Sequence, residues 1–181
     1  WADSVAGDMA RHYSPGRTWE ATARGLAHLL EPGDVLDIAS GDGALAELIA
    51  PTASSITCLD ISERVVEAGR KKVQSFPHVK FELGDMHSLP VSDESFDTVL
   101  LMHALTYTTE PPQVFTEAAR VLRPGGHLLA VTLSKHNHAK AVEPYNHVNL
   151  GFTAGELEAF CSHAGLAVRH CAVSAIEKRT P

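Results

Sequence analysis

Two closely spaced glycines give this chain its clearest sign of a binding site. An apolar run that begins at Val35 breaks at Gly41 and Gly43, and a segment rich in helix-forming residues follows at once. A strand, a tight turn and a helix start in this order let the backbone approach a ligand that a Cβ atom would exclude. The turn indicates a nucleotide-like cofactor, although bare structural turns share the same pattern.

Three aspartates at the ends of expected strands narrow the choice of ligand. Asp60 ends the second apolar segment, 19 residues after Gly41, where a carboxylate can accept hydrogen bonds from both hydroxyls of a ribose. Both a nicotinamide dinucleotide and S-adenosylmethionine satisfy these two features. Asp37, inside the first strand, suits the cationic amine of a methionine moiety, and Asp85 can accept from an adenine amino group. The three positions together favour S-adenosylmethionine.

Strands and helices alternate along the part of the chain that carries these residues. Apolar and β-branched segments predict strands at residues 35–39, 56–61, 79–83, 96–102 and 127–133. Helices are expected at residues 44–50, after the cap residue Ser62, at 111–122 and from the cap residue Thr153 to His163. This order predicts an α/β, Rossmann-like, doubly wound and mainly parallel sheet. Residues 167–176 also have strand character.

Composition limits the class of protein. A chain of 181 residues that is 44% hydrophobic can bury one core. Residues 1–31 are expected to form an N-terminal helical lid of two helices, and residues 32–181 the cofactor-binding domain. The net charge of −7 disfavours a surface for nucleic acid, and no apolar run is long enough for a membrane span. Three scattered cysteines indicate reduced thiols and a cytoplasmic protein.

Five motifs together resemble one known family. They lie at Val35 to Ala46, Cys58 to Ile61, Gly84 to Val91, Phe96 to Met102 and Arg120 to Leu129. In this order they look like a class I S-adenosylmethionine-dependent methyltransferase, of the branch similar to ubiquinone-biosynthesis C-methyltransferases. The flanks, residues 13–19 and 147–152, resemble a narrower group in which this domain follows an ArsR-type winged helix-turn-helix. On that resemblance the chain is a C-terminal domain, which fits its start at Trp1, and the family's seventh strand is missing.

The resemblance also implies the cofactor-binding residues. The methionyl end would be held by residues of the glycine turn, the ribose and adenine by residues that follow the second and third strands, and the sulfonium side would be bordered by the end of the fourth. The implied set is Tyr13, Arg17, Asp37, Ala39, Gly41, Gly43, Asp60, Ile61, Asp85, Met86 and Met102. Of these, Tyr13 and Arg17 belong to the expected lid, where ordinary helix-surface roles are equally compatible with the sequence.

The acceptor side offers fewer constraints. The leaving thioether takes no proton, so the protein must mainly align the reactants and exclude water. A base is needed only when the acceptor loses a proton, and the candidates are His103 and Tyr107 as catalytic residues and His147 as a substrate-binding residue. A strand-end histidine and a packing aromatic are the simpler alternatives. The spacing of His136, His138 and His147 matches no metal site, so no metal is expected.

Two functions remain open from the sequence. The first is an enzyme that methylates an unidentified small molecule. The second is a sensor of S-adenosylmethionine or S-adenosylhomocysteine that acts on an attached DNA-binding domain, as a transcriptional regulator. A nicotinamide oxidoreductase is disfavoured by Asp37 and Asp85. The expected partners are a small-molecule methyl acceptor and, through an N-terminal domain that this chain lacks, a second copy in a homodimer; neither nucleic acid nor membrane is expected.

Overall fold

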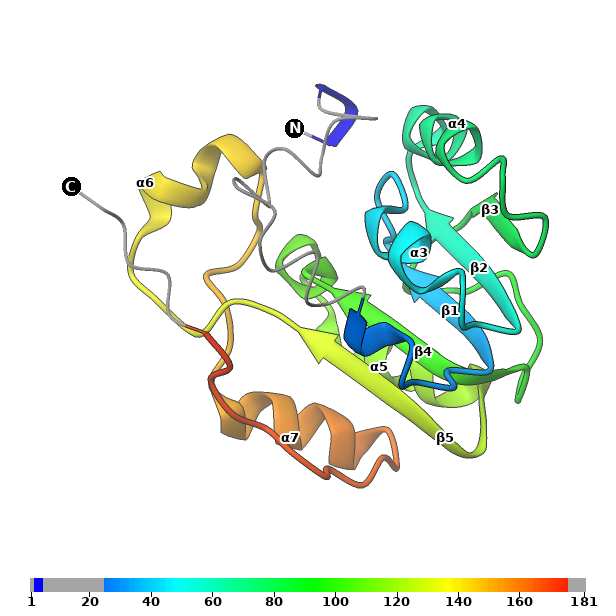
Figure 1. Cartoon of the computed structure of the whole chain (residues 1–181). Coiled ribbons are helices and arrows are strands. Elements are labelled where there is room, and N and C mark those ends of the chain that lie inside the picture. The colour runs from blue at the N-terminus through cyan, green and yellow to red at the C-terminus, as the bar shows by residue number, and fades with distance from the viewer. Residues whose placement is uncertain (1, 5–24, 176–181) are drawn as a thin grey trace.

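A parallel sheet forms the centre of the computed structural model, which describes residues 2–4 and 25–175 (Figure 1). Its strands are β1 (Asp34–Ile38), β2 (Ser55–Asp60), β3 (Val79–Leu83), β4 (Phe96–Met102) and β5 (Leu122–Val131). The order across the sheet is β3-β2-β1-β4-β5, and every neighbouring pair is parallel. This arrangement confirms the predicted doubly wound α/β fold, and it places the carboxyl ends of all five strands along one edge.

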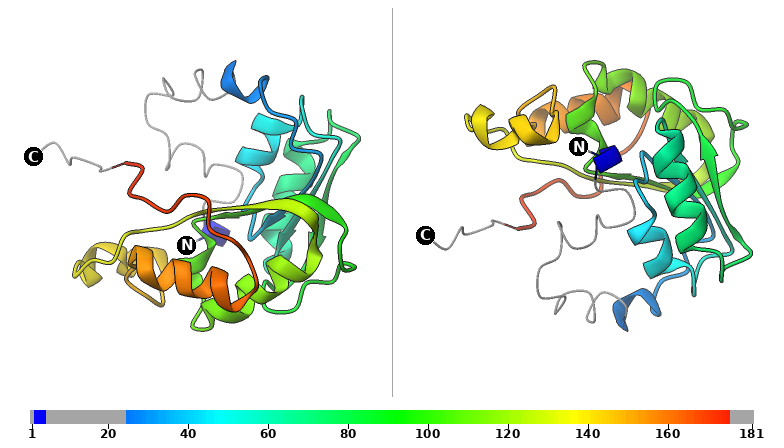
Figure 2. Two further views of the ribbon diagram at one scale, coloured as in Figure 1. Left: turned by 90° about the horizontal axis from the view of Figure 1, so that it is seen from below. Right: turned by 90° about the horizontal axis from the view of Figure 1, so that it is seen from above.

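Helices cover both faces of this sheet (Figure 2). The α-helices are α3 (Ala44–Ile49), α4 (Glu63–Lys72), α5 (Pro111–Val121), α6 (Ala139–Val142) and α7 (Ala154–His163). The described residues also form the short 3-10 helices η1 (Ala2–Ser4), η2 (Ala104–Tyr107) and η3 (Glu143–Tyr145). In the described part of the chain, no helix is both long and apolar enough to span a membrane.

Alternation along the strands divides the apolar side chains into two cores. Leu36 and Ile38 of β1 pack in the core beneath α5 and α7, whereas Val35 packs with the residues of α3 and α4. Because successive side chains of a strand point to opposite faces, Asp37 lies on the same face as Val35. The sequence therefore places a carboxylate in the apolar layer that carries the glycine turn.

Helix starts follow the predicted capping chemistry. The Ser62 hydroxyl accepts a hydrogen bond from the Val65 N–H at the start of α4. Thr153 and Glu156 form a reciprocal capping box at the start of α7. Such caps satisfy backbone donors that a helix leaves without partners in its first turn.

Two expectations about strands need correction. The fifth strand begins at Leu122 rather than at residue 127, because Leu122 already pairs with Phe96 and the ladder then shifts register before Thr98 pairs with His127. The residues between them form a bulge, which lets one strand carry extra residues. The strand expected over residues 167–176 is wrong for its described part, because residues 166–175 pair with no strand of the sheet and Val168 and Val173 are exposed.

The N-terminal segment is described only in part. Residues 5–24, which contain most of the two predicted helices, lie outside the described residues. A helical turn at residues 25–27 ends before Leu30, three residues earlier than expected. The division into a lid at residues 1–31 and a domain at 32–181 stays a prediction.

The Phe81 ring generates a prediction about Gly69. A Cβ atom at Gly69 of α4 would overlap this buried ring, whereas a Cβ atom at Gly155 of α7 would meet nothing within 4 Å. Overpacking costs about 1–3 kcal/mol, and the helix propensity gained over glycine is about 1 kcal/mol. We expect Gly69→Ala to lower the free energy of unfolding in urea, and the control Gly155→Ala to leave it unchanged or raise it. Equal stabilisation by both substitutions would contradict this packing.

Candidate functional site

The predicted cofactor-binding residues converge on the carboxyl edge of the sheet. Strand order reverses between β1 and β4, and ligands of open α/β sheets bind in the crevice at such a switch point. The residues come from the ends of four strands: Asp37, Ala39, Gly41 and Gly43 in or after β1, Asp60 and Ile61 at the end of β2, Asp85 and Met86 after β3, and Met102 at the end of β4. Their common location is what a ligand lying across the strand ends requires.

Backbone conformation explains the residue types in the glycine turn. Gly41 and Gly43 both have positive φ angles, of 58° and 78°, and Ala39 has a φ of 55°. Glycine adopts this left-handed region without strain. At Gly43 a Cβ atom would also press on the Phe81 ring. The turn therefore requires glycine at position 43 for two reasons, its backbone conformation and its close packing against the Phe81 ring.

Asp60 connects this turn to the next helix. Its Oδ2 accepts a hydrogen bond from the Gly41 N–H at 3.1 Å, and its Oδ1 accepts one from the Ser62 N–H at 3.0 Å. Burial raises the pKa of this carboxyl group, an effect opposed by these hydrogen bonds. Each carboxylate oxygen can accept more than one hydrogen bond, so Asp60 can hold the two turns and still accept from ribose hydroxyls.

Asp37 is buried without a full set of partners. Its side chain is 2% exposed, and Oδ1 makes no hydrogen bond with any described residue. Burial, and then the nearby charge of Asp60, raise its pKa from 3.8 to about 7. A buried polar atom without a partner is costly, and a cationic amine would supply both a hydrogen bond and charge. Asp37 therefore fits the amine of a methionyl group.

Sequence reasoning missed the role of Asp42 between the two glycines. Its side chain is 1% exposed, and Oδ1 lies 3.3 Å from the Lys72 amine at the end of α4. This contact ties the turn to α4. A buried carboxylate facing a helix end cannot be recognised from the motif, in which the position looks like a solvent-facing loop residue.

Asp85 is held by a neighbour that the sequence analysis also missed. Its Oδ1 accepts hydrogen bonds from the His87 backbone N–H at 2.9 Å and from the His87 ring at Nδ1, 2.7 Å away. These bonds lower the pKa of the Asp85 carboxyl group. Only the first of them has a sequence signal, since an aspartate often bonds the backbone two residues on. Met86 is half-buried against the core.

The end of β4 presents the candidates nearest the acceptor side. Met102 packs against the core on the α3 and α4 face. His103 follows with a φ of 60°, and its N–H donates to the Val131 carbonyl of β5 at 2.7 Å. A positive φ at a residue other than glycine is uncommon and concentrates at functional sites. This turn leads the chain from the carboxyl end of β4 into η2.

Tyr107 and His147 come together although 40 residues separate them. Their rings meet edge to face with centroids 5.1 Å apart, and the adjacent Val148 N–H donates to the Thr106 carbonyl of η2 at 2.9 Å. The Nδ1 atom of His147 is buried and makes no hydrogen bond with a described residue. Burial lowers the pKa of His147, with smaller contributions from His136 and His103. The imidazole is therefore neutral near pH 7.

Two of the predicted cofactor-binding residues, Tyr13 and Arg17, lie outside the described residues. The Ser62 hydroxyl, however, donates to the Asp3 carboxylate, which brings η1 beside the end of β2. His136 and His138 stack on each other. In the described ranges no group of three His, Cys, Asp or Glu side chains is placed to hold a metal ion.

Known proteins match the same part of the chain. The family model for a methyltransferase domain matches residues 36–130. A demethylmenaquinone methyltransferase of Tropheryma whipplei is 32% identical over 64% of this chain and 48% of its own length. A ubiquinone/menaquinone biosynthesis C-methyltransferase of Pseudomonas fluorescens is 31% identical over 75% of this chain and 56% of its own. The chain thus spans about half the length of these curated relatives.

The fold also has solved counterparts. The crystal structure of the YcgJ protein of Bacillus subtilis is similar to this chain with a TM-score of 0.69 and 26% identity. The similarity covers 81% of this chain and 69% of the other. The matched portion includes most of the described sheet and helices, so the likeness concerns the whole arrangement rather than one turn.

The pKa of Asp37 predicts an unusual dependence of stability on pH. The folded protein keeps this proton up to about pH 7, whereas the unfolded chain releases it near the ordinary aspartate pKa of 3.8. The folded state binds more protons in between, so this carboxyl group makes the free energy of unfolding fall as pH rises from about 4 to 7. We expect ligand-free Asp37→Asn to be more stable than wild type at pH 8, by about 2–4 kcal/mol, and nearly equal at pH 4.

Urea unfolding at several pH values measures this difference. The matched control is Glu82→Gln, which also neutralises a carboxylate but alters an exposed contact with Lys80. Its unfolding curve should stay close to that of wild type at both pH values, because exposed ion pairs contribute little. Parallel pH profiles for wild type and Asp37→Asn would show that Asp37 ionises without penalty.

Proposed function

Because the chain belongs to the family of methyltransferase domains, as its motifs predict, we propose that it binds S-adenosylmethionine and methylates a small molecule. The observation that carries the proposal is the buried Asp37 carboxylate of β1, which has an oxygen that no described residue satisfies. When bound, the cofactor supplies a methyl group on a positively charged sulfur. The protein then has to hold the two reactants in line and keep water away.

The methionyl and ribose ends would be held by β1 and β2. Asp37 accepts a hydrogen bond from the ammonium group, and the ligand approaches the backbone of the turn at Gly41. Asp60 accepts from the ribose hydroxyls with the lone pairs that Gly41 and Ser62 leave available. Ammonium binding favours ionised Asp37, so affinity should rise as pH increases through about 7.

The adenine ring would lie between the ends of β2 and β3. Ile61, which is 72% exposed at the strand edge, offers an apolar face. Asp85 turns Oδ1 toward His87 and keeps Oδ2 for the adenine amino group, while Met86 lines the ring edge. An exposed isoleucine that becomes covered by a base recovers part of its burial energy.

His147 is our candidate base on the acceptor side. Its lowered pKa keeps the ring neutral, and the rings of Tyr107 and Tyr145 flank it at centroid distances of 5.1 and 5.9 Å. This aromatic surrounding suits a flat acceptor that loses a proton on methylation, such as a phenol or a quinol. His103 borders the same side from the end of β4. The names of the two relatives refer to demethylmenaquinone and to ubiquinone/menaquinone biosynthesis.

The sensor role, the lid and the homodimer are predictions that no described residue tests. The sensor of S-adenosylmethionine attached to an ArsR-type domain, the lid with Tyr13 and Arg17, and the homodimer stay predictions, and no contact of a described residue favours the sensor. The donor site proposed above would serve enzyme and sensor alike, because both bind the same ligand.

Removing the Asp60 carboxylate tests the donor site. We expect Asp60→Ala to weaken binding of S-adenosylhomocysteine by roughly 10-fold or more, since hydrogen bonds to a charged group contribute about 1.5–3 kcal/mol. Calorimetric titration with S-adenosylmethionine, S-adenosylhomocysteine and NAD measures this, with the α4 surface variant Glu67→Ala as the control. Undiminished binding by Asp60→Ala would refute the ribose contact, and tight NAD binding would refute the methyl-donor proposal.

Replacing His147 tests the acceptor side. We expect His147→Phe to lower kcat by about 10²–10⁴-fold, the usual contribution of a general base, with the KM for S-adenosylmethionine unchanged. Formation of S-adenosylhomocysteine with a panel of naphthoquinols, phenols and thiols provides the assay. In wild type, kcat should be constant from pH 7 to 8 and fall at lower pH, where His147 becomes protonated. The control Tyr145→Phe keeps a neighbouring ring, and equal kcat in all three proteins would exclude a base at His147.

A further inference from the structure

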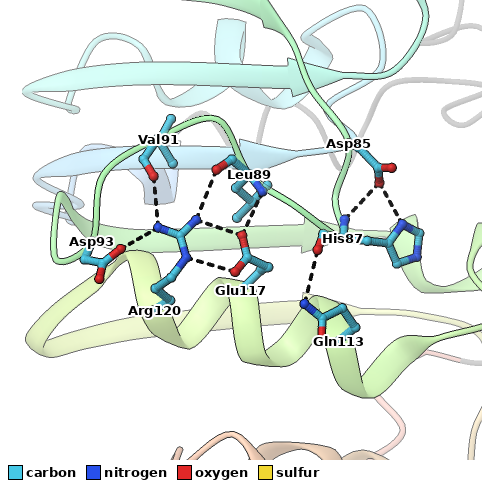
Figure 3. Close-up of polar contacts among 8 residues, drawn as sticks. All are labelled: Asp85, His87, Leu89, Val91, Asp93, Gln113, Glu117 and Arg120. Atoms are coloured by element: carbon cyan, nitrogen blue, oxygen red, sulfur yellow. Dashed lines mark hydrogen bonds and ion pairs between the residues drawn. The ribbon is translucent and has the colours of Figure 1, made fainter.

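The segment that carries Asp85 is anchored along α5 (Figure 3). Glu117 accepts a hydrogen bond from the Leu89 N–H at 2.7 Å, and Arg120 donates to the Leu89 carbonyl at 3.0 Å. Further along the segment Arg120 also reaches the Val91 carbonyl at 2.9 Å and Asp93 at 2.6 Å. The segment after β3 is therefore fixed to the helix by several charge-assisted bonds.

His87 lies at the end of the anchored segment nearest Asp85. Its carbonyl accepts a hydrogen bond from the Gln113 side chain of α5 at 3.2 Å. Its ring has a partner at each nitrogen: Nδ1 lies 2.7 Å from Asp85 Oδ1, and Nε2 lies 2.6 Å from the Thr108 hydroxyl. The imidazole thus joins the segment after β3 to the connection that follows η2.

The partners determine which ring nitrogen carries the proton. Asp85 is a carboxylate that can only accept, so Nδ1 must donate to it. The Thr108 hydroxyl accepts from the Glu110 N–H at 2.9 Å and can give its own proton to Nε2. With a proton on Nδ1, every member of the chain therefore has a partner. Thr108 is only 2% exposed, so this hydroxyl is a fixed partner rather than a surface group.

These bonds restrict the Asp85 carboxylate, which is otherwise half exposed. Oδ1 receives two hydrogen bonds from His87, one from the backbone and one from the ring. The backbone bond alone leaves the carboxylate free to turn, whereas the second bond fixes its plane. The other oxygen is then held in one direction, as hydrogen-bond recognition of a ligand group requires.

We propose that His87 is a positioning residue for the cofactor: it holds Asp85 so that Oδ2 faces the 6-amino group of adenine, with Thr108 as its support. This inference rests on the proposed function, because it assumes that the site binds an adenosyl ligand. It assigns His87 and Thr108 to the recognition of the base.

Discrimination between two ligands separates positioning from a general structural role. The ligands are S-adenosylhomocysteine and its 6-deamino analogue, in which hydrogen replaces the amino group, and the readout is the ratio of their dissociation constants. The variants are His87→Phe, Thr108→Val and the conservative Thr108→Ser. The matched control is Gln113→Ala, which removes an anchor from the same segment but leaves the imidazole contacts intact. Thermal unfolding of each variant checks its folding.

We expect wild type to prefer S-adenosylhomocysteine by roughly 10–100-fold. His87→Phe should reduce the preference to about 3-fold or less, and Thr108→Val should reduce it partly. Thr108→Ser and Gln113→Ala should retain the wild-type ratio. If His87→Phe does not fold, the pair Thr108→Val and Thr108→Ser decides the question, because the two differ in the hydroxyl that His87 contacts.

Other outcomes overturn specific claims. If His87→Phe binds both ligands more weakly by the same factor, so that the ratio of dissociation constants is unchanged, His87 only stabilises the segment. Binding without preference in wild type would refute adenine recognition by Asp85 and His87 but leave the donor site. Failure of wild type to bind either ligand would refute the proposed function itself.

Discussion

The Asp60 carboxylate joins the two turns on which the candidate site is built. One oxygen accepts from Gly41 in the turn after β1, and the other accepts from Ser62 at the start of α4. Since β1 and β2 are neighbouring parallel strands, these two bonds hold the connections that follow them side by side at the carboxyl edge of the sheet. Because one of the two donors is the Gly41 N–H, the glycine turn is fixed to the end of β2.

Asp37 shows the opposite solution to the same problem of a buried carboxylate. Asp60 is satisfied by backbone donors, whereas Asp37 has an oxygen with no partner among the described residues and a pKa raised to about 7. The charge of Asp60 adds to the effect of burial on the pKa of Asp37, and a cation beside Asp37 would relieve that penalty. On our proposal this cation is the ammonium group of the methyl donor.

The sequence predicts the repeating part of this structure well and its individual contacts poorly. The strands at 79–83 and 96–102 and the caps at Ser62 and Thr153 follow from local patterns, and the structure confirms them. The bulge at the start of β5 depends on pairing with Phe96, which no local pattern records. Residues 167–175, the described part of a segment with strand character, pair with no strand of the described sheet. The roles of His87 and Asp42 come from contacts with Thr108 and Lys72, which are distant in sequence.

The two sides of the site differ in how firmly the fold holds them. On the proposed adenine side, Glu117 and Arg120 of α5 form hydrogen bonds with the backbone of the segment after β3. On the acceptor side, Asn149 ties the loop to η2 by donating to the carbonyls of Leu105 and Thr108, and most residues from 137 to 146 are exposed. Loops with few buried contacts tolerate change, whereas anchored segments do not. On our proposal the donor side can therefore stay constant while the acceptor loop varies, so the motifs would indicate the methyl donor and residues such as His147 would select the acceptor.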